Sequence, residues 1–202
     1  TVVLSVVLAV AIFMMLPYYV SSFFQKIIPS QWAVALLEGV IRLVIFVGYV
    51  ALISLMKDIK RVYMYHGAEH KCINCIEHGL DLNVENVRKS SRLHKRCGTS
   101  FLLIVMLVSV LFFMFIRVDS PLLRVVYRLV LIPVIAGVSY EFIRLAGRSD
   151  NVIVNLLSKP GMWLQRITTS EPDDEMIEVG IASVEAVFDW KPYVEEIRRE
   201  MH

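Results

Sequence analysis

Residues 100–116 read Ser-Phe-Leu-Leu-Ile-Val-Met-Leu-Val-Ser-Val-Leu-Phe-Phe-Met-Phe-Ile and contain no charged side chain. A helix crosses the hydrocarbon core of a bilayer with roughly 17–25 such residues. Three further apolar runs have the length of a crossing, at about Val2–Phe24, Trp32–Met56 and Leu122–Ala146. Pro17 and Pro133 lie inside two of these runs, where neighbouring helices must accommodate them. The sequence therefore predicts an all-α, polytopic membrane protein with four transmembrane helices.

The composition agrees with this class. The 202 residues are 56% hydrophobic, and the mean hydropathy is +0.61. A net charge of +2 is too small to indicate nucleic acid as a partner, so the expected environment is the lipid bilayer. The chain begins at Thr1 inside an apolar run, without methionine or a signal-peptide pattern. We therefore expect a further region to precede it.

Basic residues are concentrated in one connection between spans. Residues 57–98 hold nine lysines and arginines, whereas the other two connections, 25–31 and 117–121, hold one each. By the positive-inside rule, the 57–98 loop and both chain ends are expected to be cytoplasmic. A reducing compartment would keep the three cysteines as thiols and favour metal binding over a disulfide.

The predicted organisation has four parts. These are transmembrane helices 1 and 2 in residues 1–56, a metal-site loop in 57–98, transmembrane helices 3 and 4 in 99–148, and a cytoplasmic tail in 149–202. In the tail, Asn151–Thr168 suits a segment lying in the membrane interface. The pattern Ser170-Glu171-Pro172-Asp173 predicts the start of a helix.

Apolar residues then recur at helical spacing in the tail: Ile177, Ile181, Val184 and Phe188. This spacing predicts an amphipathic helix whose apolar face meets a partner surface, such as another membrane protein. Trp190-Lys191-Pro192 is expected to interrupt it, before a charged terminal helix that runs to about His202.

Four of the five histidines and all three cysteines lie between His66 and Cys97. His66 and His70 are four residues apart, so on a helix continuing out of the second span they project from one face. With Glu69 they form His-x-x-Glu-His, the order found in inverted zinc peptidases, where two imidazoles hold the metal and the carboxylate polarises water. His94 and Cys97 form a second cluster before the third span.

The predicted metal ligands are His66, His70, Cys75, His94 and Cys97, with Zn²⁺ as the expected ion and Glu69 as the catalytic base. Cys72 and His78 are expected to be bystanders, and His202 a solvated terminal residue. The alternative to a metal is a hydrogen-bonded polar loop. The segment Cys97-Gly98-Thr99-Ser100 also lies at the start of a span. Free backbone amides there could bind an anion and lower the pKa of Cys97. The alternative is that the segment only caps the helix.

Charged residues also lie inside the spans: Glu38, Arg42, Arg124 and Arg128. Because charges in hydrocarbon are normally paired or face water, Glu38 is expected to pair with Arg42 or with Arg128. This polar cluster is either a structural ion-pair network or a polar pocket or conduction path in the outer half of the bundle. Glu141, near the cytoplasmic end of the fourth span, is a possible additional metal ligand by analogy with the inverted peptidases.

Several motifs resemble the YqhQ-like family of bacterial membrane proteins. They are Tyr65-His66-Gly67-Ala68-Glu69-His70-Lys71, Ile73-Asn74-Cys75, Val84-Glu85-Asn86-Val87, Arg92-Leu93-His94 and Arg96-Cys97-Gly98-Thr99-Ser100-Phe101, followed by Leu131-Ile132-Pro133, Pro160-Gly161, Trp163-Leu164-Gln165, Thr168-Thr169 and Glu171-Pro172. The resemblance covers most of the chain and implies a bacterial cytoplasmic membrane protein. The family is classed as a domain of unknown function and is sometimes labelled a predicted metal-dependent enzyme. Its pattern matches every predicted ligand and Glu69, whereas Cys72 falls on a valine position of a relative.

Three functions are consistent with the sequence. A non-catalytic scaffold for other membrane proteins, slightly favoured, predicts a closed zinc site with four protein ligands. A membrane-bound metal-dependent hydrolase predicts an open coordination position with a pocket beside it. A carrier or channel that uses the intramembrane charges is the weakest of the three, and a dry, packed interior would exclude it.

Overall fold

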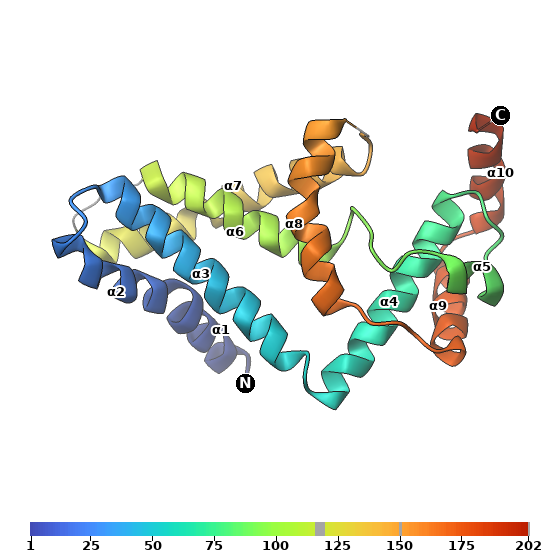
Figure 1. Cartoon of the computed structure of the whole chain (residues 1–202), viewed down its shortest axis with the longest axis horizontal. Helices are drawn as coiled ribbons and strands as arrows, with labels where there is room; N and C mark the ends of the chain where they lie inside the picture. The colour runs from blue at the N-terminus through green and yellow to red at the C-terminus, as the bar shows by residue number, and fades with distance from the viewer. Residues whose placement is uncertain (116–119, 150, 202) are drawn as a thin grey trace. The chain divides into compact units, whose positions relative to one another are not determined.

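The computed structural model describes residues 1–115, 120–149 and 151–201, and the regular elements in this part of the chain are all helices (Figure 1). The elements are α1 Val2–Val10, the π-helix η1 Ala11–Met15, α2 Leu16–Phe23, the 3-10 helix η2 Phe24–Lys26, α3 Gln31–Ile53, α4 Lys57–Glu77, α5 Val84–Lys89, α6 Gly98–Phe115, α7 Pro121–Ala146, α8 Val152–Thr168, α9 Asp174–Val187 and α10 Trp190–Glu200.

Four helical segments have the length and hydropathy of membrane spans. They are Val2–Lys26, Gln31–Ile53, Gly98–Phe115 and Val125–Ala146. Each falls within a few residues of an apolar run found in the sequence, so the all-α polytopic fold is confirmed. The chain divides into two compact units, residues 1–49 with 101–155, and residues 50–100 with 156–202.

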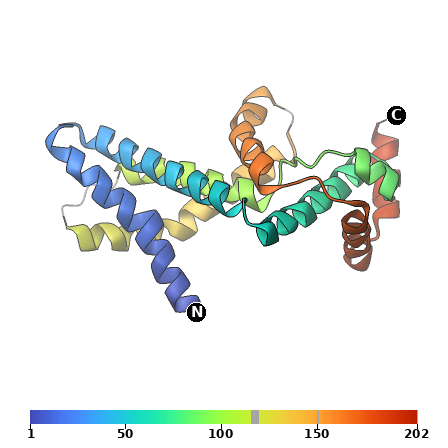
Figure 2. The same ribbon diagram turned by 60° about the horizontal axis from the view of Figure 1, so that its bottom comes forward.

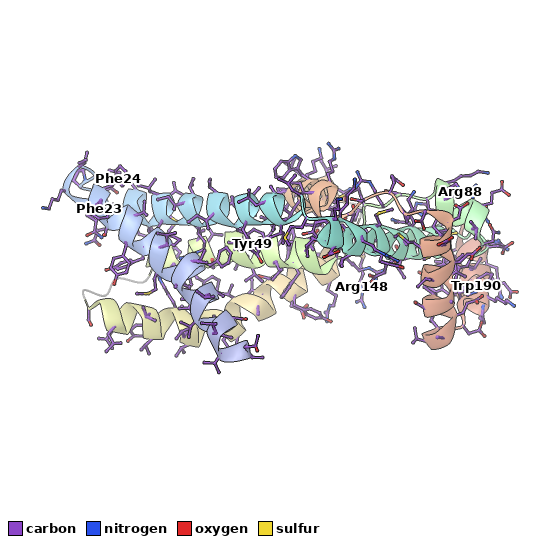
Figure 3. The ribbon with its side chains drawn as sticks, turned by 90° about the horizontal axis from the view of Figure 1, so that it is seen from below. Phe23, Phe24, Tyr49, Arg88, Arg148 and Trp190 are labelled. Carbon is purple, nitrogen blue, oxygen red and sulfur yellow. The ribbon has the colours of Figure 1, made fainter. Side chains whose placement is uncertain are left out.

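The first unit contains most of each span. Its α3 and α6 run side by side (Figure 2), and Trp32 stacks edge-on against Phe115 with ring centroids 5.3 Å apart. The first span is not a uniform α-helix, because η1 separates α1 from α2. Phe23 and Phe24 lie at the end of this span (Figure 3).

Pro17 explains one contact of the first span. Proline has no N–H, so the carbonyl of Phe13 lacks its usual donor four residues on. Arg42 of α3 supplies the missing donor, with its Nε 2.9 Å from the Phe13 oxygen. Pro133 lies within α7, which continues through it. A neighbouring helix therefore accommodates Pro17, as the sequence predicted.

The second unit is built on α4. Helices α5, α9 and α10 pack against it, and its core consists of Cys72, Cys75, Ile76, Leu82, Val87, Ile177 and Val194. The α4 helix is not a continuation of the second span as expected: α3 ends at Ile53, and Met56 has an extended backbone before α4 begins at Lys57. His66 and His70 nevertheless share one helix.

The amphipathic helix predicted in the tail is α9, but its apolar face meets this chain itself. Ile177 is fully buried, and Ile181 and Val184 pack on the core of the second unit. The interruption after α9 falls at Phe188 and Asp189, whereas the predicted interrupting residues, Trp190-Lys191-Pro192, form the first turn of α10. Asp189 caps α10 by accepting a hydrogen bond from the Lys191 amide. Pro192 fits the first turn of α10, because a backbone N–H at that position would have no helical carbonyl to bind.

Candidate metal centre

His66, His70 and Cys97 bring their ligand atoms within 4.8 Å of one another. The two histidines lie one turn apart on α4, and their ring centroids are 4.4 Å apart. Cys97 immediately precedes α6. Imidazole nitrogen and thiolate sulfur are the donors that zinc prefers, so the chemistry of this group fits that ion.

Backbone carbonyls fix both imidazole rings. His66 Nδ1 lies 2.8 Å from the Thr168 oxygen, and His70 Nδ1 lies 2.7 Å from the Arg92 oxygen. A carbonyl oxygen only accepts hydrogen bonds, so each Nδ1 donates a proton to its carbonyl, and each Nε2 is left to bind Cys97 or an ion. Histidines that bind metals are usually held in this way.

Cys97 is set up as a thiolate. Its Sγ lies 3.3 Å from His66 Nε2 and 3.2 Å from Thr99 Oγ1. Burial raises the pKa of the Cys97 thiol, but hydrogen bonds with His66, His70 and Thr99 outweigh this effect and lower the pKa to about 5. The bond with Cys97 in turn raises the pKa of His66. A lowered pKa for this cysteine was one of the expectations from the sequence. The main cause of the lowering is the hydrogen bonding of Cys97 with the two imidazoles.

Buried amides hold the segment that carries Cys97. Gln165 of α8 is fully buried; it accepts from the His94 amide at 2.8 Å and donates to the His94 carbonyl at 2.7 Å. It also donates to Ser100 Oγ at 2.6 Å. Asn74 donates to the carbonyls of Ser91 and Leu93 at 2.7 and 3.0 Å.

Sequence reasoning gave neither Asn74 nor Gln165 a role. One signal was available for Asn74, because His66, His70 and Asn74 recur every four residues and therefore share a face of α4. Nothing comparable marks Gln165, whose partners lie far from it in the sequence.

A glycine allows the segment after α8 to approach α4. A Cβ added to Gly67 would lie 2.2 Å from the Ser170 carbonyl oxygen, closer than any side chain permits. Ser170 N also donates to the Tyr63 carbonyl at 2.9 Å. The same segment carries the Thr168 carbonyl that is hydrogen-bonded to His66.

His94 is not part of the group, although the sequence predicted it as a ligand. Its Nε2 is 2.8 Å from Glu77 Oε2, and Glu77 also pairs with Arg96. Burial alone would raise the pKa of Glu77, but the hydrogen bond with His94 and the charge of Arg96 bring it below its ordinary value. The Glu77 carboxylate is therefore hydrogen-bonded to His94 Nε2, the atom that would have to bind the ion.

Cys75 also lies outside the group. It is fully buried in the core of the second unit, where its Sγ donates to the Asp81 carbonyl at 3.4 Å. Cys72 is equally buried, and this raises the pKa of its thiol to about 12. His78 is exposed, with its Nδ1 2.6 Å from the Asn74 carbonyl. His202 lies outside the described residues.

Glu69 lies beside the group without belonging to it. It is exposed, and it lines a pocket of about 280 Å³ together with His66, His70 and Cys97. His94, Arg96 and Gly98 complete one wall. The three candidate ligands therefore border a space large enough for a small substrate group, with the exposed Glu69 carboxylate at its edge.

The intramembrane charges form one cluster in the first unit. Glu38 pairs with Arg42 at 2.8 Å and with Arg128 at 2.7 Å, so both predicted pairings occur together. The side chain of Arg124 lies outside the described part of the structure. Glu141 pairs with Arg144 on α7 at 3.2 Å, and both side chains are exposed.

Comparison with known proteins gives a family but no activity. The model of a family described as "Protein of unknown function (DUF1385)" matches residues 1–190. The chain is 37% identical over 201 residues to "Uncharacterized protein YqhQ" of Bacillus subtilis (strain 168). This alignment covers 99% of the chain and 63% of that relative, so the chain spans less than two thirds of its length. No solved structure matches.

Proposed function

We propose that this chain, which belongs to the DUF1385 family of unknown function, is a membrane-bound, metal-dependent hydrolase. The proposal rests on the geometry of the site. His66, His70 and Cys97 hold a zinc ion, and Glu69 is the general base. One observation carries the proposal: backbone carbonyls fix both imidazole rings so that their Nε2 atoms remain available beside a thiolate.

The ligand count supports a catalytic site. Structural zinc sites normally have four protein ligands, whereas catalytic sites have three and leave one position open. The group contains three, and the pocket beside it provides space for the fourth position. A zinc ion bound there would supply Lewis-acid polarisation of the substrate and of water.

The other residues have distinct roles in this proposal. Glu69 accepts a proton from the attacking water, and its exposed carboxylate lies at the edge of the pocket. Thr168 and Arg92 orient the imidazoles through their carbonyl groups. The expected substrate is a membrane protein or a lipid-linked molecule at the cytoplasmic surface, because the basic 57–98 segment carries α4 and the positive-inside rule places it there.

The scaffold, slightly favoured by the sequence, is the second candidate. It requires four protein ligands and no room for substrate, but His94 and Cys75 are engaged elsewhere. The apolar face of α9 that was to bind a partner is buried in the chain itself. A membrane-protein partner would have to use other exposed apolar residues of the tail, such as Val187 and Phe188.

Elemental analysis of the purified chain tests the metal. We expect about one zinc ion per chain, and loss of most of it in His70→Ala. The matched control is His78→Ala, which removes an imidazole from the same helix outside the group and should keep the zinc. If His70→Ala retains as much zinc as His78→Ala, the assigned site is wrong.

Glu69→Gln tests the chemistry. This variant should keep the zinc, because Glu69 is not a ligand. Its hydrolysis of a panel of chromogenic esters and fluorogenic peptides should fall by at least about 100-fold. Loss of zinc in Glu69→Gln would contradict the role as base. X-ray absorption showing four protein ligands, together with no hydrolysis by the wild type, would identify the scaffold instead.

A further inference from the structure

The intramembrane cluster carries an excess positive charge. Glu38 lies between the guanidinium groups of Arg42 and Arg128, and each of the three residues is only 6% exposed. One carboxylate faces two cations. Among the described residues of the first unit, no second carboxylate pairs with either arginine. Charges at membrane depth are normally neutralised by a partner, so one positive charge is left to be balanced.

The arginines also have hydrogen-bonding capacity to spare. Arg128 Nε is buried and has no hydrogen-bond partner within the described part of the chain. Arg42 uses Nε for the Phe13 carbonyl and Nη2 for Glu38. The acceptor for its Nη1 is Ser109 Oγ at 3.5 Å, the outer limit of a hydrogen bond. An unmatched buried donor is costly, which indicates that a further acceptor binds here.

An apolar cavity of about 310 Å³ leads to Arg42. Most of its lining is hydrocarbon or aromatic, including Phe13, Phe46, Tyr49, Met106 and Ile135, and Arg42 and Ser109 form its polar part. Phe113, which also lines the cavity, lies under both guanidinium groups, 5.2 Å from Arg42 Cζ and 5.0 Å from Arg128 Cζ. The cavity and the excess charge thus meet at one place.

We propose that the first unit binds a single-chain carboxylate amphiphile, namely a long-chain fatty acid. The acyl chain occupies the apolar cavity, and the carboxylate accepts hydrogen bonds from Arg42 and neutralises the charge it shares with Arg128. The negative charge required and the planar fit of a carboxylate to guanidinium favour this head group. An apolar cavity of about 310 Å³ suits one acyl chain.

Binding of radiolabelled palmitate to the purified full chain in dodecyl maltoside tests this inference. The uncharged analogue hexadecanol should bind at least about tenfold more weakly, because it cannot balance the positive charge. Val105 of α6 also lines the cavity. Val105→Phe adds bulk there, keeps both arginines in the sequence and should weaken palmitate binding by about tenfold or more. The control Val130→Phe adds the same ring at a position of α7 that is 66% exposed, and it should bind like the wild type.

Three results would overturn the proposal. Equal affinity for palmitate and hexadecanol would mean that the charge takes no part. Unchanged palmitate binding in a folded Val105→Phe chain would remove the cavity from the site. Tighter binding of hexadecyl phosphate than of palmitate would contradict the carboxylate. The zinc-free His70→Ala chain should bind palmitate normally, so failure here is separable from failure of the proposed hydrolase.

Discussion

The three cysteines of this chain lie in very different surroundings, although their side chains are chemically identical. Cys97 is beside two imidazoles, whereas Cys72 and Cys75 are packed into the core of the second unit. The sequence predicted Cys75 as a ligand because Cys-x-x-Cys is a common zinc spacing. Its burial depends on contacts of α4 with Ile177 and Val194, about 100 residues further along the chain, and spacing does not report such contacts.

Alkylation by iodoacetamide after chelation should distinguish these thiols. Only the thiolate reacts. With a pKa of about 5, Cys97 is already ionised at neutral pH, so its rate should stay nearly constant between about pH 8 and pH 6. An ordinary thiol, with a pKa of about 8.5, would slow almost tenfold per unit over that range. Cys72 and Cys75 should stay unmodified in peptide mass spectra.

His66→Ala is the matched variant for this measurement. It removes the hydrogen bond to Cys97 Sγ and leaves the cysteine in place, so the pKa of Cys97 should rise and its reaction at about pH 6 should slow. A wild-type rate that falls about tenfold per pH unit below pH 8 would show that Cys97 is an ordinary thiol.

At the level of elements, hydropathy and helical period predicted most of the fold. The four spans follow from uninterrupted apolar runs, and the shared face of His66 and His70 follows from their spacing on α4. The sequence did not reveal how α8 reaches the site, because the hydrogen-bond partners of Gln165 and Thr168 lie 65–102 positions away along the chain. Local patterns predict helices; the contacts between helices that complete a site depend on the tertiary fold.

Gly67→Ala tests the close approach of the chain to α4. The added methyl group would meet the backbone oxygen of Ser170, which cannot rotate away. We expect a loss of roughly 1–3 kcal/mol in the free energy of unfolding, which lowers the melting temperature by about 2–4 °C per kcal/mol. Zinc content should fall as well, because the Thr168 carbonyl would be displaced from His66.

Gly137→Ala is the control for this change. A Cβ there would have no atom within 4 Å, so the variant should be as stable as the wild type or more stable by up to about 1 kcal/mol. Thermal melts followed by tryptophan fluorescence, with zinc measured on the same samples, compare the two variants. Equal melting temperatures would show that Ser170 does not constrain α4.

For the whole molecule, the distribution of charge leads to a definite arrangement in the membrane. If each candidate span crosses the bilayer, the connection 27–30 and the segment 57–97 lie on opposite sides of it. The segment 57–98 has nine basic residues, and the connection 25–31 has one. The positive-inside rule therefore predicts a cytoplasmic position for the proposed zinc site, where reducing conditions would keep Cys97 from forming a disulfide.

Labelling of single added cysteines with a membrane-impermeant maleimide tests this arrangement in intact cells. Ile27 is 75% exposed between the first two spans, and the Lys89 side chain is 70% exposed on α5. Ile27→Cys should react without permeabilisation, whereas Lys89→Cys should react only after the membrane is opened. The unsubstituted chain, labelled in the same way with and without permeabilisation, gives the background from its own three cysteines. Losing the solvent-exposed pair of Lys89 with Glu85 should change stability little, so Lys89→Cys should fold normally. The reverse labelling pattern would place His66, His70 and Cys97 outside the cytoplasm and would exclude a cytoplasmic substrate for the proposed hydrolase.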